Sequence, residues 1–148
     1  MIKKFFDKGV MIALIITAEH KIESGIEFLT PGNYSQQLGF MNRPVGYKIA
    51  PHVHNPVVRE VVWTQEVLFI KSGKVRVDFY DSDRNYLESE LLEKGDVIIL
   101  AGGGHGFEII EEAVMIEVKQ GPYCADKDKT RFEPNIETIK YNRNFELA

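Results

Sequence analysis

Short runs of apolar and β-branched residues, each ended by glycine, proline or charged residues, recur along the chain from Val10 onward. Runs of this length and type predict β-strands, and no segment shows helical periodicity over more than a turn or two. The expected strands are 10–17, 34–41, 45–54, 61–71, 74–80, 87–92, 96–100, 107–110 and 114–119. Closely spaced strands with little helix indicate an all-β antiparallel sandwich or barrel.

Turn-forming residues separate these runs. Ser72 and Gly73 lie between two apolar runs and predict the turn of a β-hairpin, and the polar segment 81–85 predicts a second turn. The chain changes character after Gly121, where the charged segment 126–129 predicts a solvated loop. The range 136–141 that follows is compatible with one last edge strand, packed on the same chain or on a partner subunit.

The amino terminus resembles the start of a signal peptide, because Lys3 and Lys4 precede the apolar run 10–16. Asp7 and Lys8 interrupt that pattern, and no clear cleavage site of small residues follows. The run is also far shorter than the roughly 18 to 20 apolar residues that span a bilayer. It is therefore predicted to be a buried strand, and no membrane association is expected.

Composition narrows the class of protein further. A chain of 148 residues with 44% apolar content is expected to form one domain with its own core. The net charge of −4, with both signs interspersed, gives no basic surface for nucleic acid or anionic membrane. Cys124, the single cysteine, cannot form an internal disulfide, which favours a reducing compartment and hence the cytoplasm.

Three of the four histidines lie near the strongest strand patterns. His52 and His54 are two residues apart on the expected strand 45–54, so their side chains share one face and can bind one ion. Glu66 and His105 are the candidates that complete a set of four ligands.

The spacing of these residues resembles the two motifs of the cupin superfamily. In the first, Gly46 and five residues precede His52 and His54, and Glu66 and six residues precede Gly73. Eleven residues separate His54 from Glu66, more than is usual in the family. Glu60 is nearer the usual spacing but lacks the following glycine, so Glu66 is preferred.

The second cupin motif is matched less closely. Gly95 and five residues precede Ala101 and Gly103, with alanine where the family has proline. His105 comes one residue early, and Ile109 stands where the motif ends in asparagine. The resemblance covers about residues 36–119, between the strand segment 10–17 and a C-terminal extension 121–148.

This resemblance implies a double-stranded β-helix, the jelly-roll barrel of cupins, in a single domain spanning 1–148. It implies a divalent transition metal held by His52, His54, Glu66 and His105. This ligand set suits Fe, Mn, Ni, Co or Zn and leaves open positions for water or substrate. The alternative is a polar pocket without metal, in which a histidine acts as a base, as in sugar-modifying cupins.

Four further residues are candidates for substrate contact. Lys48 shares strand parity with the His52–His54 pair and either points inward or reaches solvent at the rim. Arg59 and Trp63 lie in the long insertion, where they could cover the entrance and touch substrate, and packing in the scaffold is the alternative for Trp63. Phe107 is two residues after His105 and would share its face, as an apolar wall or as core.

Two functions from different classes fit these patterns. The first is a metal-dependent enzyme acting on a sugar derivative or organic acid, by dioxygenase, isomerase, epimerase or lyase chemistry, with Glu66 as a candidate base. The second is a non-catalytic module that binds or senses a small molecule. The resemblance implies a homodimer in either case, because cupins of this size commonly pair as dimers. The β-forming segments at both ends of the chain could cross to a partner or cover the chain's own sheet edges.

Overall fold

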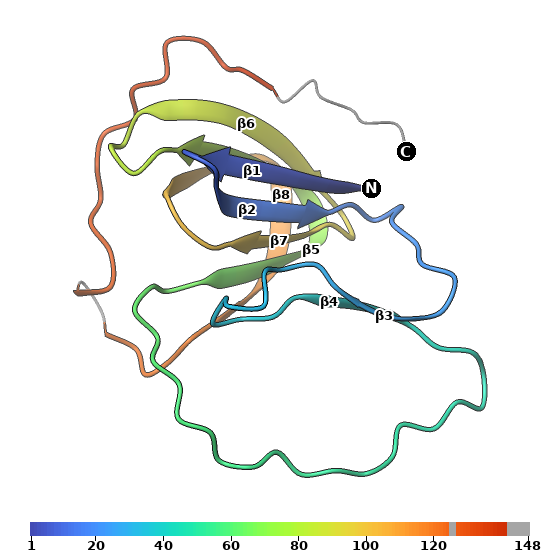
Figure 1. Ribbon diagram of the computed structural model, residues 1–148. Helices are drawn as coiled ribbons and strands as arrows, with labels where there is room; N and C mark the ends of the chain where they lie inside the picture. Colours follow the sequence, from blue (N-terminus) through green and yellow to red (C-terminus); the bar gives the residue numbers. More distant parts are fainter. Residues whose placement is uncertain (125–126, 142–148) are drawn as a thin grey trace.

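Eight β-strands make up the regular structure of the computed structural model, which describes residues 1–124 and 127–141 (Figure 1). The strands are β1 (Ile2–Asp7), β2 (Val10–Ile16), β3 (Gly25–Phe28), β4 (Gly39–Asn42), β5 (Glu66–Tyr80), β6 (Tyr86–Glu93), β7 (Val97–Leu100) and β8 (Gly104–Lys119). Every strand pairing is antiparallel, and the described residues contain no α-helix. The expected all-β antiparallel class is confirmed.

The large sheet is organised around β5. Along one edge of β5, residues 66–69 pair with β7 and residues 74–80 pair with β6. Along the other edge, β8 pairs with β5 over nearly its whole length. From β7 the sheet continues through β2 to β1, and a separate two-stranded sheet joins β3 to β4.

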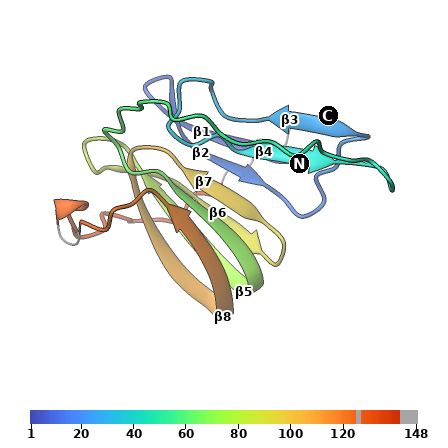
Figure 2. The same cartoon turned by 90° about the horizontal axis from the view of Figure 1, so that it is seen from below.

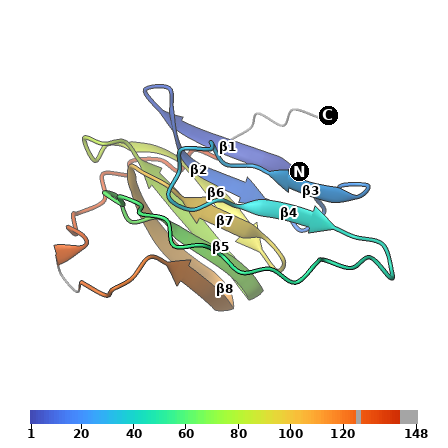
Figure 3. The same cartoon turned by 60° about the horizontal axis from the view of Figure 1, so that its bottom comes forward.

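The sheet is strongly curled, as the bent strands β5 and β8 show in Figures 2 and 3. The pairing register of β5 and β8 shifts three times between Ile70 and Val75, and such bulges bend a ribbon. Across the curl, Lys3 on β1 forms an ion pair of 3.0 Å with Glu90 on β6. The result is a half-barrel with a core on its concave side. That core includes Phe5, Ile15, Ile70, Val75, Val77, Phe79, Leu92 and Ile98.

The prediction of a hairpin turn at Ser72 and Gly73 is wrong, because β5 continues through both residues. Gly73 has φ of 83°, a conformation that glycine adopts easily in turns and also in β-bulges. The segments 107–110 and 114–119 likewise form the one strand β8. The glycine at position 73 correctly indicated an irregular backbone. The sequence alone did not indicate whether that irregularity is a hairpin turn or a β-bulge.

The expectation of a buried strand at 10–17 is confirmed. Strand β2 has a core on both faces: Ile15 packs in the concave core, and Leu14 packs with Ile99 in a second cluster on the other face. The segment that carries β3 and β4 lies over this second cluster through Leu29, Leu38 and Phe40 (Figure 3). A strand buried on both faces reads as a continuous apolar run.

Replacing Leu14 by alanine should lower the free energy of unfolding by about 3 kcal/mol, since the side chain is fully buried and its removal leaves a cavity. Val10→Ala, at the exposed start of the same strand, is the matched control and should cost well under 1 kcal/mol. Urea unfolding of both variants measures the difference. Equal losses would show that β2 is not part of the core.

Segment 43–65 differs most from expectation. The strand expected at 45–54 is absent, the strand expected at 34–41 is reduced to β4, and the one expected at 61–71 begins only at Glu66. Every residue from 44 to 63 is exposed, and most of this segment forms a wide loop standing away from the sheet (Figure 1). Its last residues, 60–63, line a hollow together with Val10, Met11 and Ala101. We call residues 44–63 the arm.

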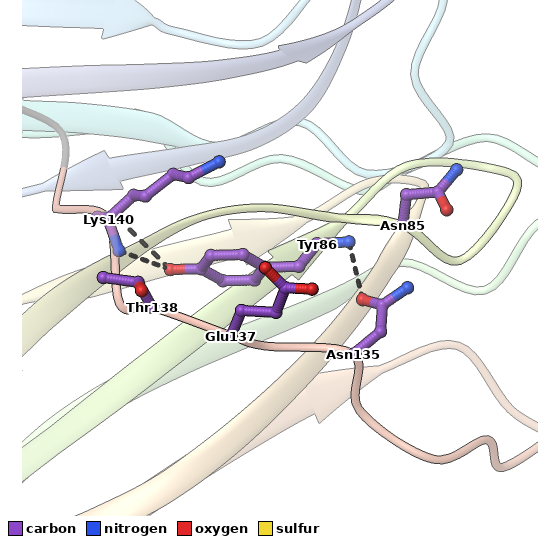
Figure 4. A pocket seen from close by; sticks show the side chains of 6 residues that line it. All are labelled: Asn85, Tyr86, Asn135, Glu137, Thr138 and Lys140. Carbon is purple, nitrogen blue, oxygen red and sulfur yellow. Dashed lines mark hydrogen bonds between the residues drawn. The ribbon is translucent and has the colours of Figure 1, made fainter.

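The described part of the C-terminal extension lies along β6, with one parallel bridge between Ser89 and Tyr141. The Tyr86 hydroxyl accepts a hydrogen bond of 2.9 Å from Lys140 N, and Tyr86 N donates one of 2.9 Å to Asn135 Oδ1. Figure 4 shows these contacts in a polar hollow lined by Asn85, Tyr86, Asn135, Glu137, Thr138 and Lys140. Of the extension, 125–126 and 142–148 lie outside the described residues.

Among the residues that the structure describes, no helix is long and apolar enough to cross a membrane.

Candidate functional site

Glu66 and His105 are in contact although 39 positions separate their numbers in the chain. Glu66 is the first residue of β5 and His105 the second of β8, and their Oε2 and Nε2 atoms lie 3.3 Å apart. In the ladder between β5 and β8 they belong to opposite ends, since Glu66 pairs with Lys119 and His105 with Phe79. Curling of the ribbon brings these two ends together.

The turn between β7 and β8 fixes this contact. Glu66 pairs with Leu100, the last residue of β7, and only residues 101–103 separate Leu100 from β8. Gly103 has φ of 62°, and a Cβ added there would lie 2.6 Å from the backbone oxygen of Tyr80. A larger residue would therefore displace His105 from Glu66.

A lysine and an aromatic ring complete the surroundings. Lys119 Nζ lies 3.8 Å from Glu66 Oε1 and 3.2 Å from Glu117 Oε1. The Phe107 ring lies 5.7 Å from the His105 ring, so the expected shared face of these two residues is present. The side chains of Glu66 and His105 are 17% and 31% exposed, so the pair is partly buried yet reachable from solvent.

Hydrogen bonding to His105 lowers the pKa of Glu66 below its usual value, and the charges of His105, Lys119 and Lys129 lower it further. Burial acts in the opposite direction but does not prevail. Glu66 is consequently a carboxylate at neutral pH, the protonation state that a metal ligand or a general base requires.

This shift of the Glu66 pKa predicts a pH dependence of stability. A carboxyl group with a lowered pKa in the folded state stabilises the protein fully above its unfolded pKa, near 4.3. That stabilisation is lost as the pH falls through the folded pKa. Between pH 6 and about pH 3, the free energy of unfolding should therefore fall less in Glu66→Gln than in the parent protein. Denaturant titrations at each pH measure this free energy for both proteins. Parallel curves for the two proteins would contradict this.

His52 and His54 form a second pair, on the arm. Their rings lie 5.2 Å apart between centroids, edge to face, and both side chains are exposed. His52 Nδ1 lies 2.9 Å from the backbone oxygen of Ala50. Because a carbonyl oxygen only accepts, Nδ1 donates its hydrogen, and Nε2 of the neutral ring keeps the lone pair that binds metals.

The four expected ligands thus lie as two separate pairs. Within 1–124 and 127–141, no group of three or more histidine, cysteine, aspartate or glutamate side chains is close enough to hold one ion. Of the expected substrate residues, Lys48, Arg59 and Trp63 are exposed on the arm, with Trp63 77% exposed. Phe107 alone lies beside the Glu66–His105 pair.

Sequence reasoning did not identify Lys119. Lys119 reaches Glu66 because the last residue of β8 pairs with the first residue of β5. No local sequence pattern specifies this long-range register. The alternation of Glu117 and Lys119 with apolar Ile116 and Val118 does place the two charged residues on one face of a strand. It does not indicate that Glu66 faces them.

Compared with protein-family models, with curated proteins and with solved structures, the chain matches none of them. Fold and site therefore define its class: an all-β protein with a curled antiparallel sheet and a glutamate–histidine pair at one end of the curl.

Proposed function

We propose that this protein is a small metal-binding protein with a cupin-like double-stranded β-helix. Glu66 and His105 provide two ligands of a divalent transition metal, and His52 and His54 on the arm provide the other two. The half-buried contact between Glu66 and His105 carries this proposal. The curled antiparallel sheet is compatible with a jelly-roll barrel.

The distance between the two donor atoms supports a shared ion. Two neighbouring ligand atoms, each bound at about 2.1 Å, lie about 3.0 Å apart on a six-coordinate ion, which keeps positions open for water or substrate, and about 3.4 Å apart on a four-coordinate one. Glu66 Oε2 and His105 Nε2 are 3.3 Å apart. A strong charge-assisted hydrogen bond between such groups is about 2.7 to 2.9 Å long, so the hydrogen bond that lowers the Glu66 pKa is a longer one that an ion can replace. Little movement of either side chain is needed to place an ion between them.

The donor chemistry also fits. The lowered pKa of Glu66 keeps its carboxylate charged, and Nε2 of His52 is free to bind. Three imidazoles and one carboxylate bind Fe, Mn, Ni, Co or Zn, so these residues do not select among the metals. Such an ion, when bound, polarises a substrate oxygen and lowers the pKa of coordinated water.

The residues around the pair suit a small, polar and anionic metabolite. Lys119 Nζ, 3.8 Å from Glu66, offers a positive charge to a carboxylate or phosphate group of a substrate, and Phe107 provides an apolar wall. Glu66 would accept a proton from a substrate held there. Dioxygenase, isomerase and lyase reactions on a sugar derivative or organic acid share these requirements.

Metal analysis of protein purified without chelator tests the proposal. The parent protein should retain close to one transition-metal ion per chain after desalting, and His105→Ala should retain far less. Glu60→Gln, an exposed glutamate of the arm that is not among the proposed ligands, is the matched control and should behave as the parent. Equal metal content in all three proteins would reject the site. Ligand-induced thermal stabilisation without turnover would identify a binding module instead of an enzyme.

A further inference from the structure

The arm has the pattern of a strand that lacks a partner. Between positions 45 and 54, most odd positions hold apolar residues, and the even positions include the expected ligands His52 and His54. Val45, Ile49 and Val53 stand at odd positions and are 106%, 59% and 85% exposed, and Lys48, His52 and His54 stand at even positions. Exposed apolar residues in such number are unfavourable in water unless another surface covers them.

Strand β8 has a free edge to which another strand could pair. In the described part of the chain it pairs only with β5, so its other edge presents unpaired backbone groups over 16 residues. Ile110, Val114, Ile116 and Val118 on this strand are 45 to 58% exposed. A long edge strand with exposed apolar side chains is a site where another strand can add, although glutamates and bulges such as those of β8 reduce that tendency.

Charge complementarity between the arm and β8 is modest. Strand β8 contains four glutamates, at positions 108, 111, 112 and 117, but three of them already form ion pairs within the chain: Glu108 with Arg76, Glu111 with Lys74 and Glu117 with Lys119. The arm contains Lys48, Arg59 and two histidines against the one negative charge of Glu60. Pro51, which has no N–H to donate, is tolerated in a strand that forms the new edge of a sheet.

Within one chain the arm is held away from this edge. Its base is fixed where Gln65 N donates to Gln120 Oε1 at 2.8 Å and Gln36 N donates to Gln65 Oε1 at 2.9 Å. Its other end continues from β4, where Asn42 Nδ2 donates to the backbone oxygens of Ile22 and Glu23. Residues 60–63 line a hollow together with Val10, Met11 and Ala101, while the rest of the arm stands clear of the sheet (Figure 1). No strand in the described part of the chain pairs with the outer edge of β8.

We infer that the arm of one copy adds as a strand to the β8 edge of a second copy, in a reciprocal homodimer. Each chain has one arm that can be donated and one β8 edge that can accept an arm. In a two-fold symmetric dimer both arms and both edges are therefore paired, and no further copy can add. The donated arm brings its two imidazoles to the Glu66–His105 pair of the second copy. This completion of the ligand set rests on the proposed function, whereas the strand exchange does not require metal.

Cysteine cross-linking between two different chains tests the exchange. One chain carries Ile49→Cys and the other Val114→Cys, both with Cys124→Ser, and the two are produced together with different tags. A short bismaleimide should join arm to β8 between the chains, and light scattering should give the mass of a dimer. Phe6→Cys in place of Val114→Cys puts the thiol on β1, at another edge of the sheet, and should not react with the arm.

Three results would overturn the exchange: a monomeric protein, cross-linking only within a chain that carries both cysteines, or preferential reaction with Phe6→Cys. The second result would show that the arm docks on its own β8. If the cross-link forms but the protein binds no metal, the exchange stands and the proposed metal site fails. The two ideas are thus separately testable.

Discussion

Gly73→Ala is expected to destabilise the fold by about 4 kcal/mol or more, a large share of the 5 to 15 kcal/mol typical of a domain. Gly73 has φ of 83°, and an added Cβ would lie 2.1 Å from the backbone oxygen of Glu112 on β8. The obstructing atom belongs to backbone, so no side-chain rotation relieves the contact. The bend of the β5–β8 ribbon depends on this position, and urea unfolding measures the loss.

Gly9→Ala is the matched control, since Gly9 also has φ of 83° but an added Cβ there would meet nothing within 4 Å. It should cost only the backbone penalty for a left-handed residue, about 1 to 2 kcal/mol. The difference between the two variants isolates the contact with β8. Similar losses for both would mean that β5 and β8 do not approach as closely at the bend.

Replacing both His52 and His54 by alanine should weaken metal binding by more than about 100-fold, because substitutions that affect ligands only indirectly already cost 10- to 100-fold. Stability without metal should be unchanged, since both side chains are exposed on the arm. Val53→Ala, at the 85% exposed position between them, is the control for arm conformation. Competition with a chromophoric chelator measures the affinity of each protein. Unchanged affinity in the double variant would restrict the site to Glu66 and His105.

The sequence predicted the parts of the fold that local pattern controls. The run around Leu14 identified a buried strand, and the short alternating runs identified an antiparallel all-β fold. Ser72 and Gly73 were misread because a left-handed glycine serves both a turn and a bulge, and only the partner strand decides between them. Strand β1 was missed because Lys3, Lys4 and Asp7 interrupt its apolar positions, although Phe5 is buried against Phe79.

The candidate site was predicted in part. The cupin-like motifs assigned Glu66 and His105 to one site, and in the structure these two side chains are in contact. The parity of His52 and His54 predicted a shared face, and their rings are adjacent, but on an arm without a strand partner. Strand formation requires hydrogen bonds to a neighbour, which a hydrophobic pattern in one segment cannot specify. Lys119 was missed for the related reason that its neighbour depends on long-range register.

X-ray absorption spectroscopy of the protein loaded with one equivalent of Zn²⁺ or Co²⁺ tests the central claim most directly, because it counts imidazole ligands around the ion. The parent protein should show three imidazoles and one carboxylate oxygen, and His105→Ala should show one imidazole fewer at reduced occupancy. A spectrum with only water and carboxylate oxygens, unchanged in His105→Ala, would contradict a metal site built from Glu66, His105, His52 and His54.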